Sequence, residues 1–341
     1  MSAGAPAAAD PQGMLGDVLA QPGQFADALW RVESAGITRS ELSGMVVCGM
    51  GGSAIGGDLA AAAIGDRAGA PIITVRGYEL PRWAGADTLV VCASYSGNTE
   101  ETLHCFEQAG AAGARRVAVT TGGKLAAAAR AAGVPVVGVP SGMQPRAAVV
   151  YMTVVALECA ELAGIAPSLR GEVDEAGQLL TQLATEWGPG AGDQPKRLAT
   201  ALEGRIPVIY GARLTTAVAR RWRSQLNENA KVVAFYGDLP EAHHNEVVGW
   251  RHADAPLTAV LLEAPGEHER MKARFDVTAE VLDAAGIPCE RVSARGDSPT
   301  ARVMSLVFLG DLVSVHLGIL LGQDPTPVAA IDDLKKRLSE R

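Results

Sequence analysis

The sequence has few aromatic residues and no excess of positive charge. Five Phe, five Trp and five Tyr among 341 residues leave Ala and Gly to fill many of the close contacts in the interior. The 30 basic side chains are outnumbered by 38 acidic ones, which gives a net charge of −8. Binding to a nucleic-acid backbone needs a basic surface that displaces counterions, so we expect no nucleic-acid partner. A local pocket for a small anion is still possible.

The five cysteines form no recognisable metal or disulfide pattern. They are widely spaced, odd in number and without a Cys-x-x-Cys pair, so we expect neither a disulfide framework nor a zinc site. Cys48 and Cys92 lie in apolar runs typical of strands, which predicts buried thiols. The adjacent histidines 243 and 244 lack an evident third ligand. We therefore predict no metal and no cofactor.

Signals for export or for a membrane span are also missing. The first residues, MSAGAPAAADPQG, have neither the basic start nor the apolar stretch of a signal peptide, so we expect a cytoplasmic protein with no membrane partner. The most apolar late stretch, 303–321, contains Asp311 and His316. A charged residue in such a stretch predicts a buried core helix.

What the sequence does contain is an alternation of apolar runs and helical patterns. About 48% of the residues are apolar and 20% are charged, as in a globular protein. The first half holds five short apolar runs separated by helical segments, which predicts a parallel sheet covered on both faces. These runs begin near residues 45, 71, 88, 115 and 134.

The second half repeats this order and predicts a second domain of the same kind. Residues 205–226 contain a strand pattern, a glycine turn and a helix pattern, as residues 45–64 do, and further runs follow at 231–237, 257–264 and 288–294. The stretch 187–197 is rich in Gly, Pro and charge, which is typical of a linker. We divide the chain into a loose tail, an N-terminal domain, a linker and a C-terminal domain that ends in an amphipathic helix, at 1–13, 14–186, 187–197 and 198–341.

The first candidate site is the glycine turn at 49–53. Glycines between a strand and a helix let the backbone approach a ligand, and the helix N-terminus presents free N–H groups to an anion. A dinucleotide site would also need an acidic residue at the end of the next strand, where the sequence has Arg76 instead. A tight turn without any ligand is the alternative.

The second candidate site, Ser94-Tyr95-Ser96-Gly97-Asn98-Thr99, is more specific. Three hydroxyls surround one glycine between a buried strand and a helix start. That arrangement suits a phosphate monoester, although no lysine is present as a P-loop would require. An ordinary Ser/Thr helix cap would explain one hydroxyl, whereas three at the carboxyl end of a strand favour a ligand.

These segments resemble a known family. GMGGSAIGGD and SYSGNTEET are similar to the sugar-phosphate-binding segments of the sugar isomerase (SIS) domain. Together with QLNENAK (225–231) and EAHHNEVVGW (241–250), they resemble the bifunctional phosphoglucose/phosphomannose isomerase family over residues 14–338. The resemblance implies an α/β fold of two tandem SIS-type three-layer αβα domains with parallel, flavodoxin-like sheets. It also implies a homodimer whose sites lie at the subunit interface.

The resemblance also implies a role for each matching residue. Glu228 would be the base that moves a proton between C1 and C2, and Arg146 would face the reacting carbons. His244, supplied by the second subunit, would open the sugar ring with the help of Lys335, for which Lys336 is the alternative. The sugar phosphate would be held by Gly52, Ser53, Ser94, Ser96 and Thr99.

The expected reaction is the metal-free interconversion of glucose 6-phosphate or mannose 6-phosphate with fructose 6-phosphate through a cis-enediol. Such a reaction needs a carboxylate base and a fixed positive charge for the developing oxyanion, which Glu228 and Arg146 provide. Thr326 offers a hydroxyl near Lys335. Two alternatives are an isomerase of another sugar phosphate, such as an aminosugar or pentose phosphate, and a non-catalytic sugar-phosphate sensor. Each of these residues, taken alone, could also be an ordinary surface or capping residue.

Overall fold

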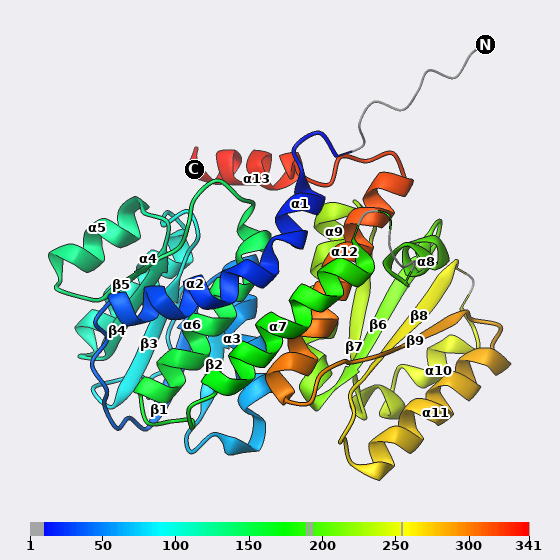
Figure 1. The fold of residues 1–341 in the computed structure, drawn as a ribbon, viewed down its shortest axis with the longest axis horizontal. Helices are drawn as coiled ribbons and strands as arrows, with labels where there is room; N and C mark the ends of the chain where they lie inside the picture. Colours follow the sequence, from blue (N-terminus) through cyan, green and yellow to red (C-terminus); the bar gives the residue numbers. More distant parts are fainter. Residues whose placement is uncertain (1–9, 189, 191–193, 254, 341) are drawn as a thin grey trace.

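The protein consists of two parallel sheets that are covered by helices (Figure 1). The computed structural model describes residues 10–188, 190, 194–253 and 255–340. The elements of the first half are α1 (Met14–Leu19), α2 (Gln21–Ser34), β1 (Gly44–Cys48), α3 (Gly51–Ile64), η1 (Gly65–Arg67), β2 (Ile72–Val75), β3 (Thr88–Ala93), α4 (Glu100–Ala111), β4 (Arg115–Thr120), α5 (Gly123–Ala131), β5 (Val136–Gly138), η2 (Pro145–Ala148), α6 (Val149–Leu162) and α7 (Arg170–Trp187). The elements of the second half are α8 (Gln194–Leu202), β6 (Ile206–Ala212), η3 (Arg213–Thr215), α9 (Thr216–Asn229), β7 (Phe235–Leu239), η4 (Glu241–His244), α10 (Val247–Trp250), β8 (Leu257–Glu263), α11 (Glu269–Ala284), β9 (Cys289–Ser293), α12 (Pro299–Leu320) and α13 (Ala329–Ser339).

The two sheets share one strand order. The first runs β2-β1-β3-β4-β5 and the second β7-β6-β8-β9, with every neighbouring pair parallel. The first order is that of flavodoxin-like sheets, and the second repeats its first four positions. The predicted α/β fold with parallel sheets is confirmed, and the repeated order agrees with the predicted internal duplication.

The apolar runs of the first half all form strands, for a simple physical reason. A central strand of a parallel sheet is covered on both faces, so every residue in it is buried. All residues of β1 and β3 are buried, including Cys48 and Cys92, as their apolar runs predicted. The run at 231–237 is different, because β7 begins only at Phe235. Lys231 has a φ of 59° there and turns the chain at the end of α9.

Helix α12 lies at the centre of the molecule, as expected for the stretch 303–321. It is long and apolar enough to span a membrane by composition, but 83% of its apolar window is buried inside the protein. Figure 1 shows α12 together with α3, α6 and α7 between the two sheets. Their apolar side chains belong to one continuous core that joins both halves of the chain.

The predicted tail and linker lie partly outside the described residues. Residues 1–9 of the tail are not described, but Asp10 accepts hydrogen bonds from the backbone N–H groups of Met14 and Leu15 at 2.8 Å each, which fixes the start of α1. Within the linker stretch 187–197, Trp187 is the buried last residue of α7, and Gln194 begins α8. The domain boundaries remain a prediction.

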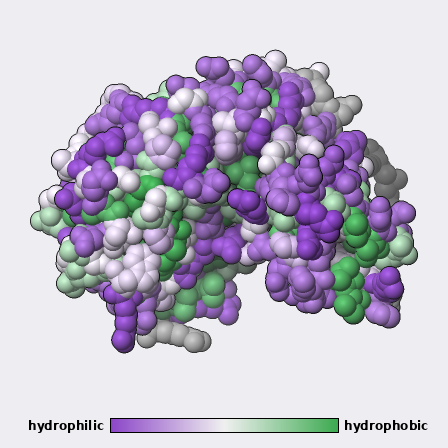
Figure 2. Space-filling view, turned by 90° about the horizontal axis from the view of Figure 1, so that it is seen from below, coloured by the Kyte–Doolittle hydropathy of each residue, from purple (hydrophilic) through white to green (hydrophobic). Residues whose placement is uncertain are grey.

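The face seen from below is mostly hydrophilic. Figure 2 shows two lobes with a notch between them, and hydrophobic residues are gathered in separate patches on this face.

Candidate active site

The two predicted turns lie side by side at one edge of the first sheet. β1 and β3 are parallel neighbours, so the turns that follow them begin at the same edge. Ser53 Oγ accepts a hydrogen bond from the backbone N–H of Tyr95 at 3.1 Å, which joins the turns directly. The structure thus brings Gly52 and Ser53 next to the second turn.

The hydroxyls of the second turn form hydrogen bonds within the turn and do not cap the helix. Ser94 Oγ lies 2.8 Å from Thr99 Oγ1 and accepts the backbone N–H of Gly97 at 3.1 Å. Ser96 is exposed, and its Oγ accepts the N–H of Asn98. Thr99 is the N-cap residue of α4, yet its side chain makes no capping hydrogen bond. The cap interpretation therefore fails for Thr99, and the first N–H groups of α4 lack a side-chain cap.

Gly97 and Tyr95 fix the shape of this turn. Gly97 has a φ of 68°, and a Cβ on it would lie 1.9 Å from the carbonyl oxygen of Gly122, so only glycine fits. The Tyr95 hydroxyl donates to the carbonyl of Pro140 at 3.0 Å and accepts the N–H of Met143 at 3.2 Å. Burial raises the pKa of Tyr95 above its ordinary value. Tyr95 thus ties the turn to the loop before Arg146, a role that the sequence analysis missed.

Arg146 lies beside these turns and is almost completely buried. It belongs to η2, and only 3% of it is exposed. A Cβ on Gly52 would lie 3.0 Å from the carbonyl oxygen of Pro145 and 3.1 Å from the Cα of Arg146. The missing side chain at Gly52 therefore lets η2 approach the glycine turn closely.

The predicted base lies next to this arginine. Glu228 is the second-last residue of α9, and its Oε2 lies 3.8 Å from Nη1 of Arg146. Its side chain is 26% exposed and can be reached by a ligand. Burial lowers the pKa of Arg146, whereas the charge of Glu228 works in the opposite direction. A reachable carboxylate beside a fixed cation suits removal of a proton next to a carbonyl group.

The segment before α13 reaches the same place. Arg146 Nη2 donates to the backbone carbonyls of Pro325 and Thr326, at 2.8 and 2.7 Å. Lys231 Nζ donates to the carbonyl of Glu228 at 2.7 Å and to that of Pro325 at 3.1 Å. Thr326 Oγ1 is buried and has no hydrogen-bond partner among the described residues. The structure therefore places Thr326 at the arginine.

His244 is not brought to this place within one chain. β6 and β7 are parallel and α9 connects them, so Glu228 lies near the start of β7 and His244 follows its end. Five residues of strand span about 13 Å. His244 is exposed at that far end. Its neighbour His243 is engaged with Thr278 Oγ1 at 2.7 Å and with Arg274 at 2.9 Å.

The described part of the chain offers no group of three or more His, Cys, Asp or Glu side chains arranged for a metal ion. Lys335 lies on α13, which Figure 1 shows crossing from the second half over the top of the first. Lys335 is exposed there. The contacts described above do not include Lys335, so its role stays a prediction.

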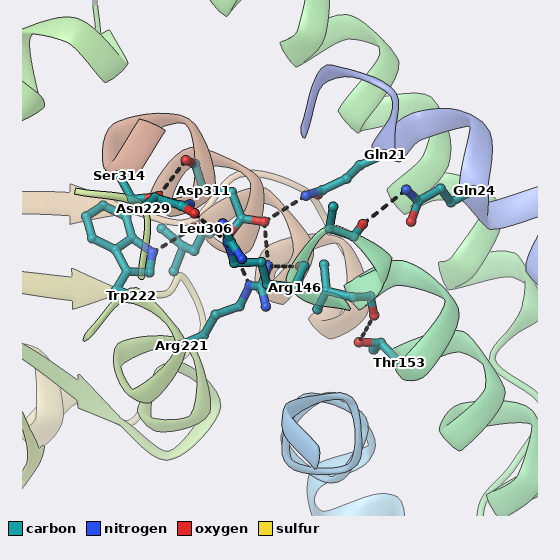
Figure 3. A network of polar contacts seen from close by, with 12 residues as sticks. Gln21, Gln24, Arg146, Thr153, Arg221, Trp222, Asn229, Leu306, Asp311 and Ser314 are labelled. Carbon is teal, nitrogen blue, oxygen red and sulfur yellow. Dashed lines mark hydrogen bonds and ion pairs between the residues drawn. The ribbon is translucent and has the colours of Figure 1, made fainter. Parts of the chain in front are cut away.

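A buried polar network behind Arg146 escaped the sequence analysis (Figure 3). Arg221 and Asp311 form an ion pair with an N–O distance of 2.6 Å, and they are 2% and 1% exposed. Gln21 donates to the same carboxylate at 2.7 Å. Arg221 also donates to the backbone carbonyl of Arg146 at 2.9 Å. The lone aspartate in an apolar helix was the available signal, because a buried carboxylate requires a partner.

Comparisons with known proteins show the family to which the chain belongs. Residues 192–338 match the family model of the bacterial phospho-glucose isomerase C-terminal SIS domain. The chain is 37% identical to a bifunctional phosphoglucose/phosphomannose isomerase of Caldicellulosiruptor bescii, over 90% of this chain and 93% of the relative. It is also 37% identical to the enzyme of that name from Aquifex aeolicus, over 87% and 91% of the two chains. In fold it is similar to a glucose-6-phosphate isomerase from Chlamydia trachomatis, with a TM-score of 0.72, 16% identity, and coverage of 92% of this chain and 72% of that one.

Proposed function

Because the chain belongs to the bifunctional phosphoglucose/phosphomannose isomerase family, we propose that it interconverts glucose 6-phosphate and mannose 6-phosphate with fructose 6-phosphate. The proton moves through a cis-enediol, without a metal ion or an organic cofactor. The proposal keeps the cytoplasmic location that the sequence predicts. The observation that carries the proposal is the position of Glu228, whose Oε2 lies 3.8 Å from Nη1 of Arg146, beside the turns at 49–53 and 94–99.

The phosphate group binds at the two turns in this proposal. The helices that follow them, α3 and α4, both begin without a side-chain capping bond, so their N-terminal N–H groups and positive dipole ends favour an anion. Gly52, Ser53, Ser94, Ser96 and Thr99 contribute backbone and hydroxyl donors. With the phosphate bound at these turns, the sugar carbons lie toward Arg146, because Gly52 is next to Arg146 in the structure.

Glu228 takes the proton from C2 of the aldose and returns it to C1 of the same carbon skeleton. The electron pair of the broken C–H bond moves into the C1–C2 bond, and the carbonyl oxygen becomes an enediolate oxygen that the guanidinium of Arg146 stabilises. The hydroxyl proton of O2 passes to O1, the proton held by Glu228 is delivered to C1, and the carbonyl forms at C2. The ketose is thus produced with Glu228 again a carboxylate, and the reaction is redox-neutral overall. Both C2 epimers yield the same enediol. Thr326, whose backbone carbonyl accepts a hydrogen bond from Arg146, carries a buried hydroxyl without a hydrogen-bond partner among the described residues.

Ring opening of the sugar requires an acid and a base in addition to Glu228 and Arg146. We assign it to Lys335 and to His244 of the partner subunit in a homodimer. The support is topological: Glu228 precedes β7 and His244 follows it, so the length of this strand, about 13 Å, lies between them, and His244 is exposed. Helix α13 also exposes three apolar side chains, Ile331, Leu334 and Leu338. A second subunit packed against this helix would bury them.

The test measures turnover of each aldose phosphate separately, coupled to detection of fructose 6-phosphate, with EDTA present. We expect activity on both, and Glu228→Gln should lower kcat by about 10³-fold with little change in KM, because a general base contributes in this range. The exposed Glu203→Gln is the matched control and should be unaffected. Sugar-phosphate binding without turnover of either substrate would refute the proposal and favour the sensor.

A mixing experiment tests the shared site. Dimers of Glu228→Gln and of His244→Ala are each expected to be inactive. If they exchange subunits, half of the dimers become mixed and each mixed dimer has one intact site, so about a quarter of wild-type activity should return. No recovery after proven exchange would contradict the partner's His244 as a catalytic residue.

A further inference from the structure

The guanidinium of Arg146 is held by neutral oxygen atoms. Its Nε donates to Asn229 Oδ1 at 2.6 Å, and Nη2 donates to two backbone carbonyls. Nη1 donates to Gln144 Oε1 at 3.2 Å. A guanidinium has five N–H groups, so one N–H of Nη1 has no hydrogen-bond partner among the described residues. It belongs to the nitrogen that lies 3.8 Å from Glu228.

Asn229 is fixed more firmly than a surface amide. It is completely buried at the end of α9, next to Glu228 in the sequence. Arginine can only donate, so the atom that faces Nε must be the amide oxygen. The amide nitrogen donates to Ser314 Oγ at 2.9 Å, and Ser314 donates to the carbonyl of Asp311 at 2.7 Å. Figure 3 shows this chain of contacts between α9 and α12.

The identity of this residue matters because a buried arginine is normally paired with a carboxylate. An aspartate at 229 would have the same shape and could accept the same hydrogen bond, but it would cancel the charge of Arg146. The buried groups here are two guanidiniums, Arg146 and Arg221, against the single carboxylate of Asp311. Glu228, the proposed base, and Asp17 are part-buried carboxylates whose charges also act on Arg146. Asn229 therefore holds the guanidinium without adding a further negative charge beside it.

We propose that Asn229 is a positioning residue for the isomerisation: it holds Arg146 beside Glu228 through a neutral hydrogen bond and so leaves the guanidinium charge for the enediolate. This inference rests on the proposed function. Asn229 does not touch the substrate in this arrangement. Asn229 acts through Arg146. Replacing it should therefore weaken stabilisation of the transition state and leave binding of the uncharged part of the sugar unchanged.

The experiment compares two ligands by calorimetry. Arabinonate 5-phosphate carries a carboxylate where the enediolate charge develops, whereas glucitol 6-phosphate has a similar phosphate chain and no charge there. We expect wild type to prefer the aldonate. Asn229→Asp should reduce that preference about 10- to 100-fold, less than the roughly 10²–10³-fold effect of removing an oxyanion donor outright, because Arg146 itself is kept. It should change the affinity for glucitol 6-phosphate less than about threefold. Its kcat should fall in parallel, with KM little changed.

Controls separate charge from folding. Asn227→Asp makes the same chemical change two residues away on α9, about 200° around the helix, and should leave the preference unchanged. Ser314→Ala removes the hydroxyl that holds the Asn229 amide without adding charge. It should reduce the preference about threefold, and it decides the question if Asn229→Asp does not fold.

The outcomes distinguish the inference from the function on which it rests. A wild type that converts both hexose phosphates, combined with an unchanged preference in Asn229→Asp, overturns the inference alone. An equal loss of both ligands also overturns it, because the role of Asn229 would then be only structural. A wild type without turnover and without preference for the aldonate overturns the proposed function, and the inference with it.

Discussion

Asp311 provides the strongest test of how the buried polar network stabilises this protein. Its carboxylate accepts hydrogen bonds from Arg221 Nε at 3.0 Å and from Nη2 at 2.6 Å, and both side chains are almost fully buried. Asp311→Asn keeps the shape of the side chain and removes the charge. The substitution leaves the Arg221 cation uncompensated, close to a second buried cation, Arg146.

The expected cost is large. Removing one partner of a buried ion pair typically destabilises a protein by about 3–5 kcal/mol, because the remaining charge has lost its hydration without compensation. With a urea dependence of about 3 kcal/mol per molar, this destabilisation lowers the unfolding midpoint by about 1–1.7 M urea. The exposed Asp283→Asn is the control, and we expect a change below about 0.5 kcal/mol.

The measurement is urea unfolding followed by circular dichroism at a fixed protein concentration. A double variant, Arg221→Met with Asp311→Leu, tests the electrostatic explanation, since replacing a buried pair by apolar residues of similar size is often nearly neutral. We expect it to recover at least half of the loss. A midpoint for Asp311→Asn within about 0.2 M of wild type, or a double variant as unstable as the sum of its single changes, would refute this reasoning.

Three further substitutions test other parts of the structure. Gly52→Ala would put a Cβ 3.0 Å from the Pro145 carbonyl oxygen and should lower kcat/KM about tenfold by displacing Arg146. Gly171→Ala is the control, because the space around Gly171 is open, and it should raise the free energy of unfolding by about 0.5–1 kcal/mol. Similar activity in both variants would contradict the close approach at Gly52. Burial alone would raise the pKa of Glu172, but hydrogen bonds from Arg67 and Thr300 outweigh it and hold the pKa below its usual value. The carboxylate therefore adds stability at neutral pH that is lost as the pH falls through the lowered pKa, so Glu172→Gln should cost about 1–3 kcal/mol at pH 7 and progressively less below pH 4 in urea unfolding. A cost independent of pH would contradict this assignment.

Much of the first sheet and its turns could be predicted from the sequence. Fully buried strands give continuous apolar runs, and the turns that follow two adjacent parallel strands must meet at one edge, as they do where Ser53 accepts the N–H of Tyr95. The run at 231–237 was misleading because its valines are apolar enough for a strand, whereas Lys231 turns back to bond the end of α9. Local pattern cannot detect that bond.

The joining of the two halves could not be derived from spacing. Arg146 and Asn229 are 83 positions apart, and nothing in either segment indicates the other. Only the family resemblance placed Arg146 and Glu228 in one site. Asn229 was overlooked because an asparagine at a helix end is ordinary. The role we propose for Asn229 depends on its hydrogen bond with Arg146, which only the folded chain brings next to it.

The position of three polar groups on α9 has a consequence for how a ligand enters. Arg221, Glu228 and Asn229 belong to one helix, and together they hold both the backbone and the side chain of Arg146. A hinge motion between the halves would break these bonds and separate the base from its cation. Movement that admits a ligand must therefore leave these bonds in place, so that Glu228 stays beside Arg146.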